Sequence, residues 1–383
     1  MERNNIFNFA TSELSQDAFI CWLCNWVNFD DNDLSEDEKK LKELAIDFIE
    51  KMSGEKLGDR KVNIKRQYQK IDVLLEIQNK TEFITKEDKK DKKIPVVDMY
   101  VIIEDKVGTG LHSNQQKTYR DIISEKNESR AKIKVVYYKI YDEDNMERLK
   151  EDGIDIIFER KDMLALLEKY KNSFNNILVE DYYNYLNNIE KDVNSYIDKK
   201  LEDWNSNCYI GFFKELKNEK NLLEHAIGRQ KDCSWGYVNN SSGGFMGMWW
   251  FPLKMDEISQ VTKKFQLWQN QIELNNDLYL QIEQFYKKEK EIYNKKNIIA
   301  VKYSLGDKDD EKYDEKVKIS SEIRNKIYEE LKGKLKEKGF EFYKKRFVAG
   351  RYMTVGYFEF ENIDDCKDKI KILQYALNLL LKI

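Results

Sequence analysis

The chain has 383 residues, of which 41% are hydrophobic and 13% aromatic, enough for a sizeable core and for two or three domains. Its 66 basic and 70 acidic residues give a net charge of −4, which is not the basic balance of a typical nucleic-acid-binding domain. Two prolines argue against long disordered linkers, and no apolar run approaches the roughly 18 residues of a membrane-spanning helix. Five cysteines, an odd number, argue against a disulfide framework, and no apolar signal segment follows Met1, so the cytoplasm is the expected location.

Hydrophobic periodicity predicts the elements of the first half in chain order. Helices are expected over 12–27 and 35–52, strands near 62–68, 71–77 and 96–107, a helix over 113–126, strands over 133–141 and 155–158, and a helix over 161–171. The lysine-rich stretch 80–93 suits an exposed hairpin tip or loop. Strand, helix and strand in this order form a crossover unit, which predicts a partly parallel sheet.

The second half is expected to be an antiparallel sheet covered by helices. A helical segment over 173–217 precedes an aromatic hairpin over 234–252, a hairpin turning at Asn275-Asn276, a strand over 297–303, a helix over 319–338, a hairpin at Gly350 and a final helix from Asp365. The expected domains are 1–170, a helical connector over 171–230, and an α+β domain over 231–383.

The strand over 96–107 carries an acid and a base at its end. Side chains of a strand alternate between its faces, so Glu104 and Lys106 point the same way, roughly 7 Å apart, while Asp105 faces the other side. Charged groups that end an apolar run are costly to bury unless they meet partners or a metal ion. The end of this strand is therefore a candidate functional site.

A second carboxylate is needed to hold a divalent cation. Asp98 shares a face with Glu104, but six residues of strand separate the two by about 20 Å, too far for one ion. Asp72, at the head of a separate apolar strand that could pair beside the first, is the better partner.

An Asp on one strand followed by Glu-x-Lys on the next, here Asp72, Glu104 and Lys106, resembles the PD-(D/E)XK nuclease superfamily. The segment Ser12–Leu23 looks like the opening helix of one prokaryotic branch, and Glu104–Tyr119 resembles that branch's strand, glycine-containing loop and helix with glutamine and tyrosine. The likeness covers about residues 1–165, and the Asp72 motif departs from the pattern in lacking a preceding proline. The resemblance implies a restriction-endonuclease-like α/β core, a mixed sheet flanked by helices.

The chemistry that the resemblance implies is metal-dependent phosphodiester hydrolysis. Asp72, Glu104 and the Asp105 main-chain carbonyl would bind Mg²⁺ or Mn²⁺, and Lys106 would sit near the attacking water. Glu13 could approach from the first helix as a ligand or base. Gln115 would position Lys106 or substrate, and Tyr119, one helical turn later, would contact phosphate or pack.

Each assignment has an alternative. Glu104 and Lys106 could form a plain ion pair, Glu13 could complement the positive end of its helix, and Asp72 could close a turn. His112 is expected to be a solvated loop residue. Cys21 and Cys24 have CxxC spacing but lie in an amphipathic pattern without a second ligand pair, so a core role is favoured over zinc, redox or nucleophilic chemistry.

A weaker nucleic-acid signal lies in the second half. Cations and rings flank the Gly350 turn, and the candidate phosphate contacts there are Lys344, Lys345, Arg346 and Arg351. An ordinary amphipathic surface is the favoured alternative for this hairpin.

The leading hypothesis is a metal-dependent nuclease acting on nucleic acid, DNA favoured over RNA, in restriction, repair or defence against mobile DNA. A homodimer or a defence-system partner protein is conceivable, and a membrane partner is not expected. The runner-up is a nuclease-fold binding or scaffold protein that has lost the chemistry and acts with a partner.

Overall fold

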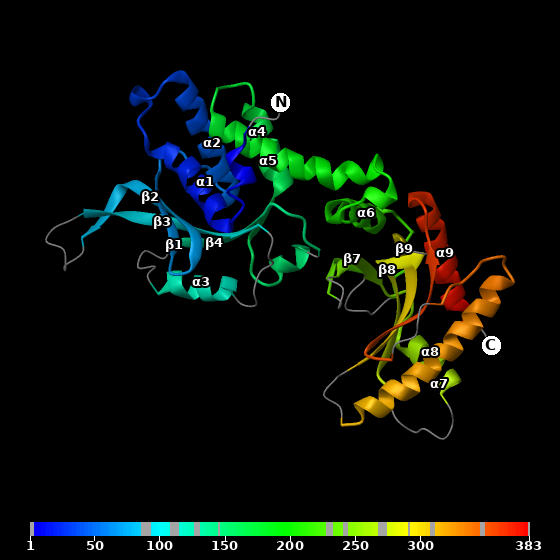
Figure 1. The fold of residues 1–383 in the computed structure, drawn as a ribbon. Helices are drawn as coiled ribbons and strands as arrows, with labels where there is room; N and C mark the ends of the chain where they lie inside the picture. Colours follow the sequence, from blue (N-terminus) through cyan, green and yellow to red (C-terminus); the bar gives the residue numbers. More distant parts are fainter. Residues whose placement is uncertain are drawn as a thin grey trace. The chain divides into compact units, whose positions relative to one another are not determined.

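A computed structural model describes residues 4–85, 93–107, 115–125, 131–144, 146–226, 233–239, 244–266, 274–289, 292–306, 311–344 and 349–381. Contacts group the chain into two compact units, Met1–Lys191 and Asp192–Ile383 (Figure 1). The division falls inside α5 (Ile177–Asn194), whose residues Val179, Tyr182 and Leu186 are buried in the core of the first unit. The finer boundaries at 170 and 230 stay predictions.

The first unit is built on a five-stranded mixed sheet. Its strands, in spatial order, are β1 (Lys61–Tyr68), β2 (Ile71–Thr85), β3 (Lys93–Lys106), β4 (Lys132–Lys139) and β5 (Ile156–Glu159). The pairs β1–β2 and β2–β3 are antiparallel, whereas β3–β4 and β4–β5 are parallel. The expected crossover is confirmed, because α3 (Gln115–Ser124) connects the parallel strands β3 and β4.

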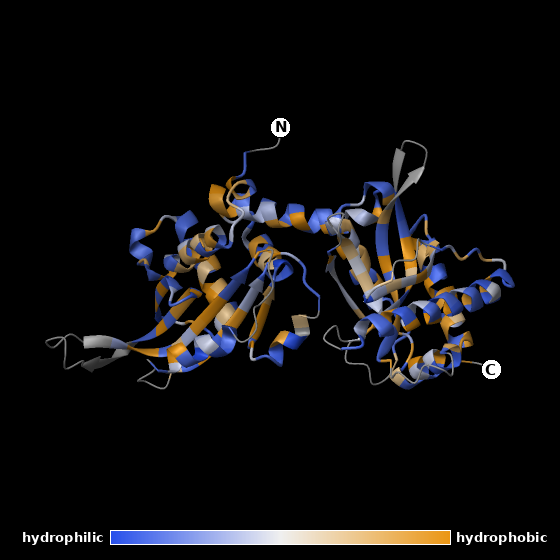
Figure 2. Cartoon of the chain, turned by 60° about the horizontal axis from the view of Figure 1, so that its bottom comes forward, coloured by the Kyte–Doolittle hydropathy of each residue, from blue (hydrophilic) through white to orange (hydrophobic). Residues whose placement is uncertain are grey.

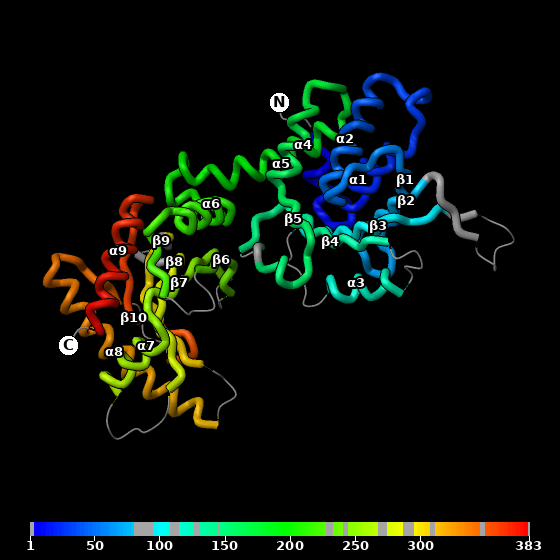
Figure 3. Tube along the Cα trace, turned by 180° about the vertical axis from the view of Figure 1, so that it is seen from behind, coloured from blue at the N-terminus to red at the C-terminus, as the bar shows by residue number. Residues whose placement is uncertain are grey.

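Helices cover both faces of this sheet. Figures 1 and 3 show α1 (Glu13–Asn25), α2 (Glu36–Ser53), α4 (Arg160–Tyr170) and α5 on one face and α3 on the other. Two hydrophobic clusters, one on each face, take alternate residues of β3: Val101 and Ile103 join the larger one, and Tyr100 and Ile102 the one beneath α3. The near-continuous apolar runs of β2, β3 and β4 follow from this two-sided burial.

Side chains define where the first helices begin. The Ser12 hydroxyl accepts a hydrogen bond from the Ser15 amide and so caps α1. Ser35 and Glu38 form a reciprocal capping box at the start of α2. The cap at Ser12 matters for function, because Glu13 is the first residue of α1 and its position depends on where that helix starts.

The second unit is an antiparallel sheet with helices packed on it. Its strand order is β10–β9–β8–β7–β6 (Figure 3), with bounds β6 (Cys233–Val238), β7 (Phe245–Trp250), β8 (Asn276–Glu289), β9 (Ile292–Leu305) and β10 (Tyr352–Glu359). The helices are α6 (Ser206–Asn218), α7 (Met255–Phe265), α8 (Tyr313–Lys336) and α9 (Ile363–Leu379). The main core takes residues from the sheet and from all four helices, and Ile298, Ala300 and Tyr357 form a smaller cluster on the other face of the sheet. Figure 2 shows how hydrophobic and polar residues alternate along these elements.

One expected hairpin of this unit differs in its described residues, and another is only partly described. Asn276, expected in the turn of the first hairpin, begins β8 and pairs with Leu305 of β9, and Phe265, expected to begin that hairpin's first strand, ends the helix α7. Residues 267–273 between them lie outside the described part of the chain. The helix buries Ile258, Val261 and Thr262, a helical spacing that the sequence analysis overlooked. Near Gly350, an isolated bridge joins Tyr343 to Tyr357, and residues 345–348 lie outside the described part of the chain.

Short 3₁₀ helices complete the described elements: Ile6–Asn8, Trp26–Asn28, Asp31–Asp33, Met146–Lys150, Ser195–Ile197 and Leu201–Asp203. Within the described residues, none of the helices has the length and hydropathy required to cross a bilayer.

Candidate active site

The sheet register brings the predicted acidic residues together. Val73 of β2 pairs with Ile103 of β3, so Asp72 lies one position beyond that pair, beside Glu104. Asp72 alternates in phase with Leu74, and Glu104 with Ile102, and both of these apolar residues belong to the cluster beneath α3. The two carboxylates therefore share the face of the sheet that α3 covers.

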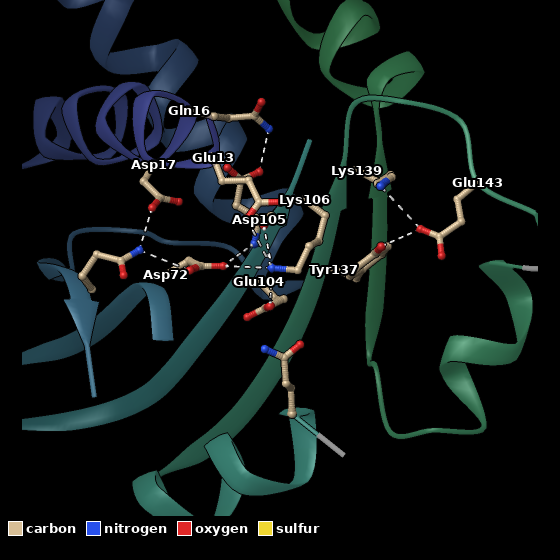
Figure 4. Close-up of polar contacts among 12 residues, drawn as sticks. Glu13, Gln16, Asp17, Asp72, Glu104, Asp105, Lys106, Tyr137, Lys139 and Glu143 are labelled. Carbon is tan, nitrogen blue, oxygen red and sulfur yellow. Dashed lines mark hydrogen bonds and ion pairs between the residues drawn. The ribbon is translucent and has the colours of Figure 1, made fainter. Parts of the chain in front are cut away.

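Lys106 lies among three carboxylates at the end of β3 (Figure 4). Its ammonium nitrogen is 2.7 Å from Glu104 Oε1, 3.7 Å from Glu13 Oε2 and 3.8 Å from Asp72 Oδ2. The same nitrogen donates to the Asp105 carbonyl at 3.2 Å. Lys106 is only 5% exposed and Glu104 1%, so the pair is buried. The structure thus gathers four residues that the sequence analysis had selected from three separate segments.

Main-chain and side-chain donors hold Asp72 in place. The Asp105 amide donates to Asp72 Oδ2 at 3.1 Å, and Gln67 Nε2 donates to Asp72 Oδ1 at 3.2 Å. Hydrogen bonds to both oxygens fix the plane of this carboxylate and direct it toward the end of β3.

The first turns of α1 supply a further layer of polar groups. Gln16 Nε2 donates to Asp105 Oδ1 at 2.6 Å, and Asp17 Oδ2 accepts from Gln67 at 2.8 Å (Figure 4). Glu13, Gln16 and Asp17 are spaced by three and four positions, so they share one helix face. Glu13 was selected from sequence and the other two were not, although this spacing was a usable signal.

Gln67 connects two acids from a strained backbone position. It lies opposite Asp72, between the paired residues Arg66–Val73 and Tyr68–Ile71, and its φ is 52°. A left-handed conformation at a residue other than glycine costs on the order of 1 kcal/mol. Such strain persists where the surroundings enforce it, and here it directs the Gln67 amide to both Asp17 and Asp72. The sequence analysis missed this residue.

Burial raises the pKa values of the central acids. The pKa of Glu104 rises to about 7, chiefly because the side chain is buried and then because the Asp72 carboxylate is nearby. Burial and the Asp72 carboxylate raise the pKa of Asp17 to about 6. Burial, followed by the charges of Asp17 and Asp72, holds the pKa of Asp105 well above its usual range. Burial alone would lower the pKa of Lys106, but the hydrogen bond and charge of Glu104 outweigh it and raise that pKa. The carboxyl groups of Glu104, Asp72 and Glu13 outnumber the single ammonium that lies within 4 Å of them, an imbalance that a bound cation would relieve.

The helix α3 brings its predicted residues to the same face. Gln115 Nε2 donates to the Tyr119 hydroxyl at 3.3 Å, and Tyr119 is buried. Burial and the charge of the nearby Glu104 raise the pKa of Tyr119 above its ordinary value, so its hydroxyl stays protonated. Gln115 thus contacts Tyr119, whose hydroxyl is close to the acid–base pair.

A second buried lysine lies beside Lys106. The parallel register pairs Lys106 with Lys139, the last residue of β4, and Glu104 with Tyr137. Lys139 is 3% exposed and lies 3.6 Å from Glu143, which also accepts a 2.7 Å hydrogen bond from the Tyr137 hydroxyl (Figure 4). The sequence analysis missed Lys139, although β4 ends on a lysine just as β3 does.

The donor set fits a hard cation. Within the described ranges, no three His, Cys, Asp or Glu side chains converge as a ready metal centre. Two carboxylates, the Asp105 carbonyl and water would nevertheless provide enough oxygen ligands for Mg²⁺ or Mn²⁺. Both Glu104 oxygens are buried, and the Lys106 ammonium lies 2.7 Å from Oε1, so a bound metal ion would share this carboxylate with the lysine.

The remaining predicted residues belong to the second unit or lie outside the described residues. Lys344 and Arg351 belong to the second unit, where their cationic groups lie over the rings of Tyr328 at 5.2 Å and Tyr352 at 5.4 Å. Lys345, Arg346 and His112 lie outside the described residues.

The two cysteines of the CxxC spacing are poor nucleophiles. Burial raises the pKa of Cys21 to about 11, and it also holds the pKa of Cys24, which is fully buried in the core, well above its usual range. A thiol that stays protonated at neutral pH is unreactive. This geometry argues against a cysteine enzyme.

Comparison of the chain with protein-family models, with curated proteins and with solved structures finds no significant match. The geometry described above therefore carries the functional argument.

Proposed function

We propose that this chain is a metal-dependent nuclease of the PD-(D/E)XK type, whose first unit is a restriction-endonuclease-like core. One observation carries the proposal: a buried lysine ammonium lies within 4 Å of carboxylates from β2, β3 and α1. The order of elements supports it further, since an acid from an antiparallel strand meets Glu-x-Lys from a strand that continues through a helix into a parallel partner.

Metal binding, water orientation and proton transfer would fall to different residues, according to their chemistry. Asp72, Glu104 and the Asp105 carbonyl would hold Mg²⁺ or Mn²⁺, which when bound neutralises phosphate oxygens and lowers the pKa of water. Lys106 would orient the attacking water and stabilise charge that develops on the phosphate. Glu13, 3.7 Å from Lys106, would accept a proton from that water or hold it in line.

The polar groups around these residues would keep them aligned. Gln67 and the Asp105 amide fix Asp72, and Gln16 fixes the Asp105 side chain, whose main chain carries the carbonyl ligand. Tyr119 and Gln115 would contact the substrate from α3. This arrangement suits phosphodiester hydrolysis, because an anionic substrate otherwise repels its nucleophile.

The test is cleavage of labelled oligonucleotides by the purified full chain. Wild type, Asp72→Ala and Lys106→Ala are each incubated with single- and double-stranded DNA and with RNA, in Mn²⁺, Mg²⁺ or EDTA. The proposal expects cation-dependent cutting by wild type alone, with DNA the better substrate. Equal activity in all three proteins would place the chemistry elsewhere and overturn the proposal.

A second candidate function is a nuclease-fold binding or scaffold protein without hydrolytic activity. The 2.7 Å Lys106–Glu104 ion pair favours it, because an ammonium already partly neutralises the acid that would bind the cation. Calorimetry separates the two candidates. A binding protein of this kind would take up no Mn²⁺ at this site and would cut no substrate, whereas the nuclease would do both.

A further inference from the structure

A second cationic group extends the candidate active site along the sheet. β3 and β4 are parallel, so their carboxyl ends meet at one edge, and the register places Lys106 and Lys139 side by side there. Paired residues of neighbouring strands point to the same face, and the strands lie about 4.8 Å apart. Lys139 is therefore on the side of Lys106 away from β2 and Asp72.

Lys139 is a buried cation whose described anionic partner is Glu143. A lysine that is 3% exposed requires a compensating anion, and the Glu143 carboxylate that faces it is 3.6 Å away, longer than the 2.7 Å pair of Lys106 and Glu104. Glu143 is about a third exposed, so it can leave this contact without unfolding the strand. Tyr137 holds Glu143 through its hydroxyl, and both thus keep the ammonium in place at the sheet edge.

The groups that face Lys139 from neighbouring elements favour an anionic ligand. Burial lowers the pKa of this lysine, the Lys106 charge lowers it further, and the charges of Glu143 and Glu13 act in the opposite direction. An additional anion in contact with Lys139 would offset the repulsion between this lysine and Lys106. A phosphate diester supplies one negative charge per nucleotide.

We infer that Lys139 binds a backbone phosphate of the nucleic acid next to the phosphate that is cut, with Glu143 as an internal anion that the substrate displaces. This inference rests on the proposed nuclease function. Lys139 is two strand spacings, about 10 Å, from the strand of Asp72, so it is placed for a neighbouring phosphate and not for the one held at Asp72 and Glu104. The two variants Lys139→Gln and Glu143→Gln then have opposite effects on binding.

The experiment measures equilibrium binding of a fluorescein-labelled DNA oligonucleotide by anisotropy in Ca²⁺, at several salt concentrations between 0.05 and 0.3 M. Loss of one phosphate contact in Lys139→Gln weakens binding about fivefold at 0.15 M salt and about fifteenfold at 0.05 M, and it lowers the salt slope by about 0.9. Lys139→Arg keeps the contact and the slope. Glu143→Gln binds more tightly than wild type, because the competing carboxylate is gone.

Lys134→Gln is the matched control, since it removes a lysine from the same strand at the end away from the site. Its salt slope stays that of wild type. If Lys139→Gln keeps the wild-type slope, or if it and Glu143→Gln both weaken binding, Lys139 is a structural lysine and the inference is wrong while the nuclease proposal stands. If wild type neither binds nor cuts nucleic acid, the inference and the nuclease proposal are overturned together.

Discussion

The Lys106 ammonium lies 2.7 Å from the Glu104 carboxylate, two positions earlier on the same strand, and the two side chains form a buried pair. A pair of this kind is neutral as a whole, but the Asp72 and Glu13 carboxylates within 4 Å make its surroundings acidic. The lysine can therefore hold a water or a phosphate while the acids hold a cation.

Replacing Lys106 should abolish cleavage without weakening cation binding. Lys106→Met removes the positive charge from among the carboxylates, so Mn²⁺ binds at least as tightly as in wild type, while the cleavage rate falls by two orders of magnitude or more. Calorimetry with Mn²⁺ and a cleavage time course measure the two effects. A Lys106→Met protein that has lost Mn²⁺ binding would show that the lysine only maintains the fold of the site.

Replacing either acid should abolish cation binding and cleavage together. Asp72→Asn and Glu104→Gln each remove one hard oxygen ligand, and Asp98→Asn is the matched control, because Asp98 lies on β3 six positions before Glu104. The control keeps wild-type Mn²⁺ affinity and wild-type cleavage. Loss of activity in Asp98→Asn to the same degree would indicate general damage to the strand in place of a specific site.

Gln67 should tune the site through Asp72. Gln67→Ala removes the amide that donates to one oxygen of Asp72 and to one oxygen of Asp17. Because groups that orient a metal ligand typically change metal affinity by about 10- to 100-fold, the Mn²⁺ affinity should fall by about that factor. Gln69→Ala is the control, since Gln69 has the same φ of 52° in the neighbouring turn. Equal losses in both variants would attribute the effect to the backbone.

The stability of the cation-free protein should fall as the pH rises from about 5 to about 8. The folded-state pKa values of Glu104 and Asp17, about 7 and about 6, lie above their ordinary values of 4.5 and 3.8. The folded protein therefore retains protons that the unfolded chain has released, and the free energy of unfolding decreases with pH in this window, by an amount on the order of 2 kcal/mol. Exposed carboxylates with lowered pKa values, such as Glu38, titrate below this pH window.

Urea denaturation in EDTA at several pH values measures this effect. The slope should be shallower in Glu104→Gln, which cannot ionise, and saturating Mn²⁺ should flatten it in wild type, because a bound cation favours the ionised acids. A free energy of unfolding that rises between pH 5 and 8 would contradict the burial argument.

The parts of the site that follow from strand geometry could be predicted from the sequence. Alternation along one strand places Glu104 and Lys106 on one face, and an apolar strand of suitable length makes Asp72 a neighbour. The spacing of Gln115 and Tyr119 on one helix likewise brings these two residues together.

Residues that depend on register or on a turn could not be predicted in this way. Lys139 is placed beside Lys106 only once β4 is known to pair in parallel with β3, and Gln67 meets two acids only because its own φ is positive. In the second unit, a pair of asparagines was taken for a hairpin turn, whereas Asn276 is the first residue of β8 and pairs with Leu305 of β9. Turn residues signal a change of direction, but they do not say which elements they join.

The most direct measurement is the position of Mn²⁺ in crystals grown with the ion, located by its anomalous scattering. The account predicts a peak within about 2.0 to 2.6 Å of carboxylate oxygens of both Asp72 and Glu104, with the Lys106 ammonium beside it. A protein that cleaves DNA in Mn²⁺ but shows its anomalous peak away from these two carboxylates would contradict the account.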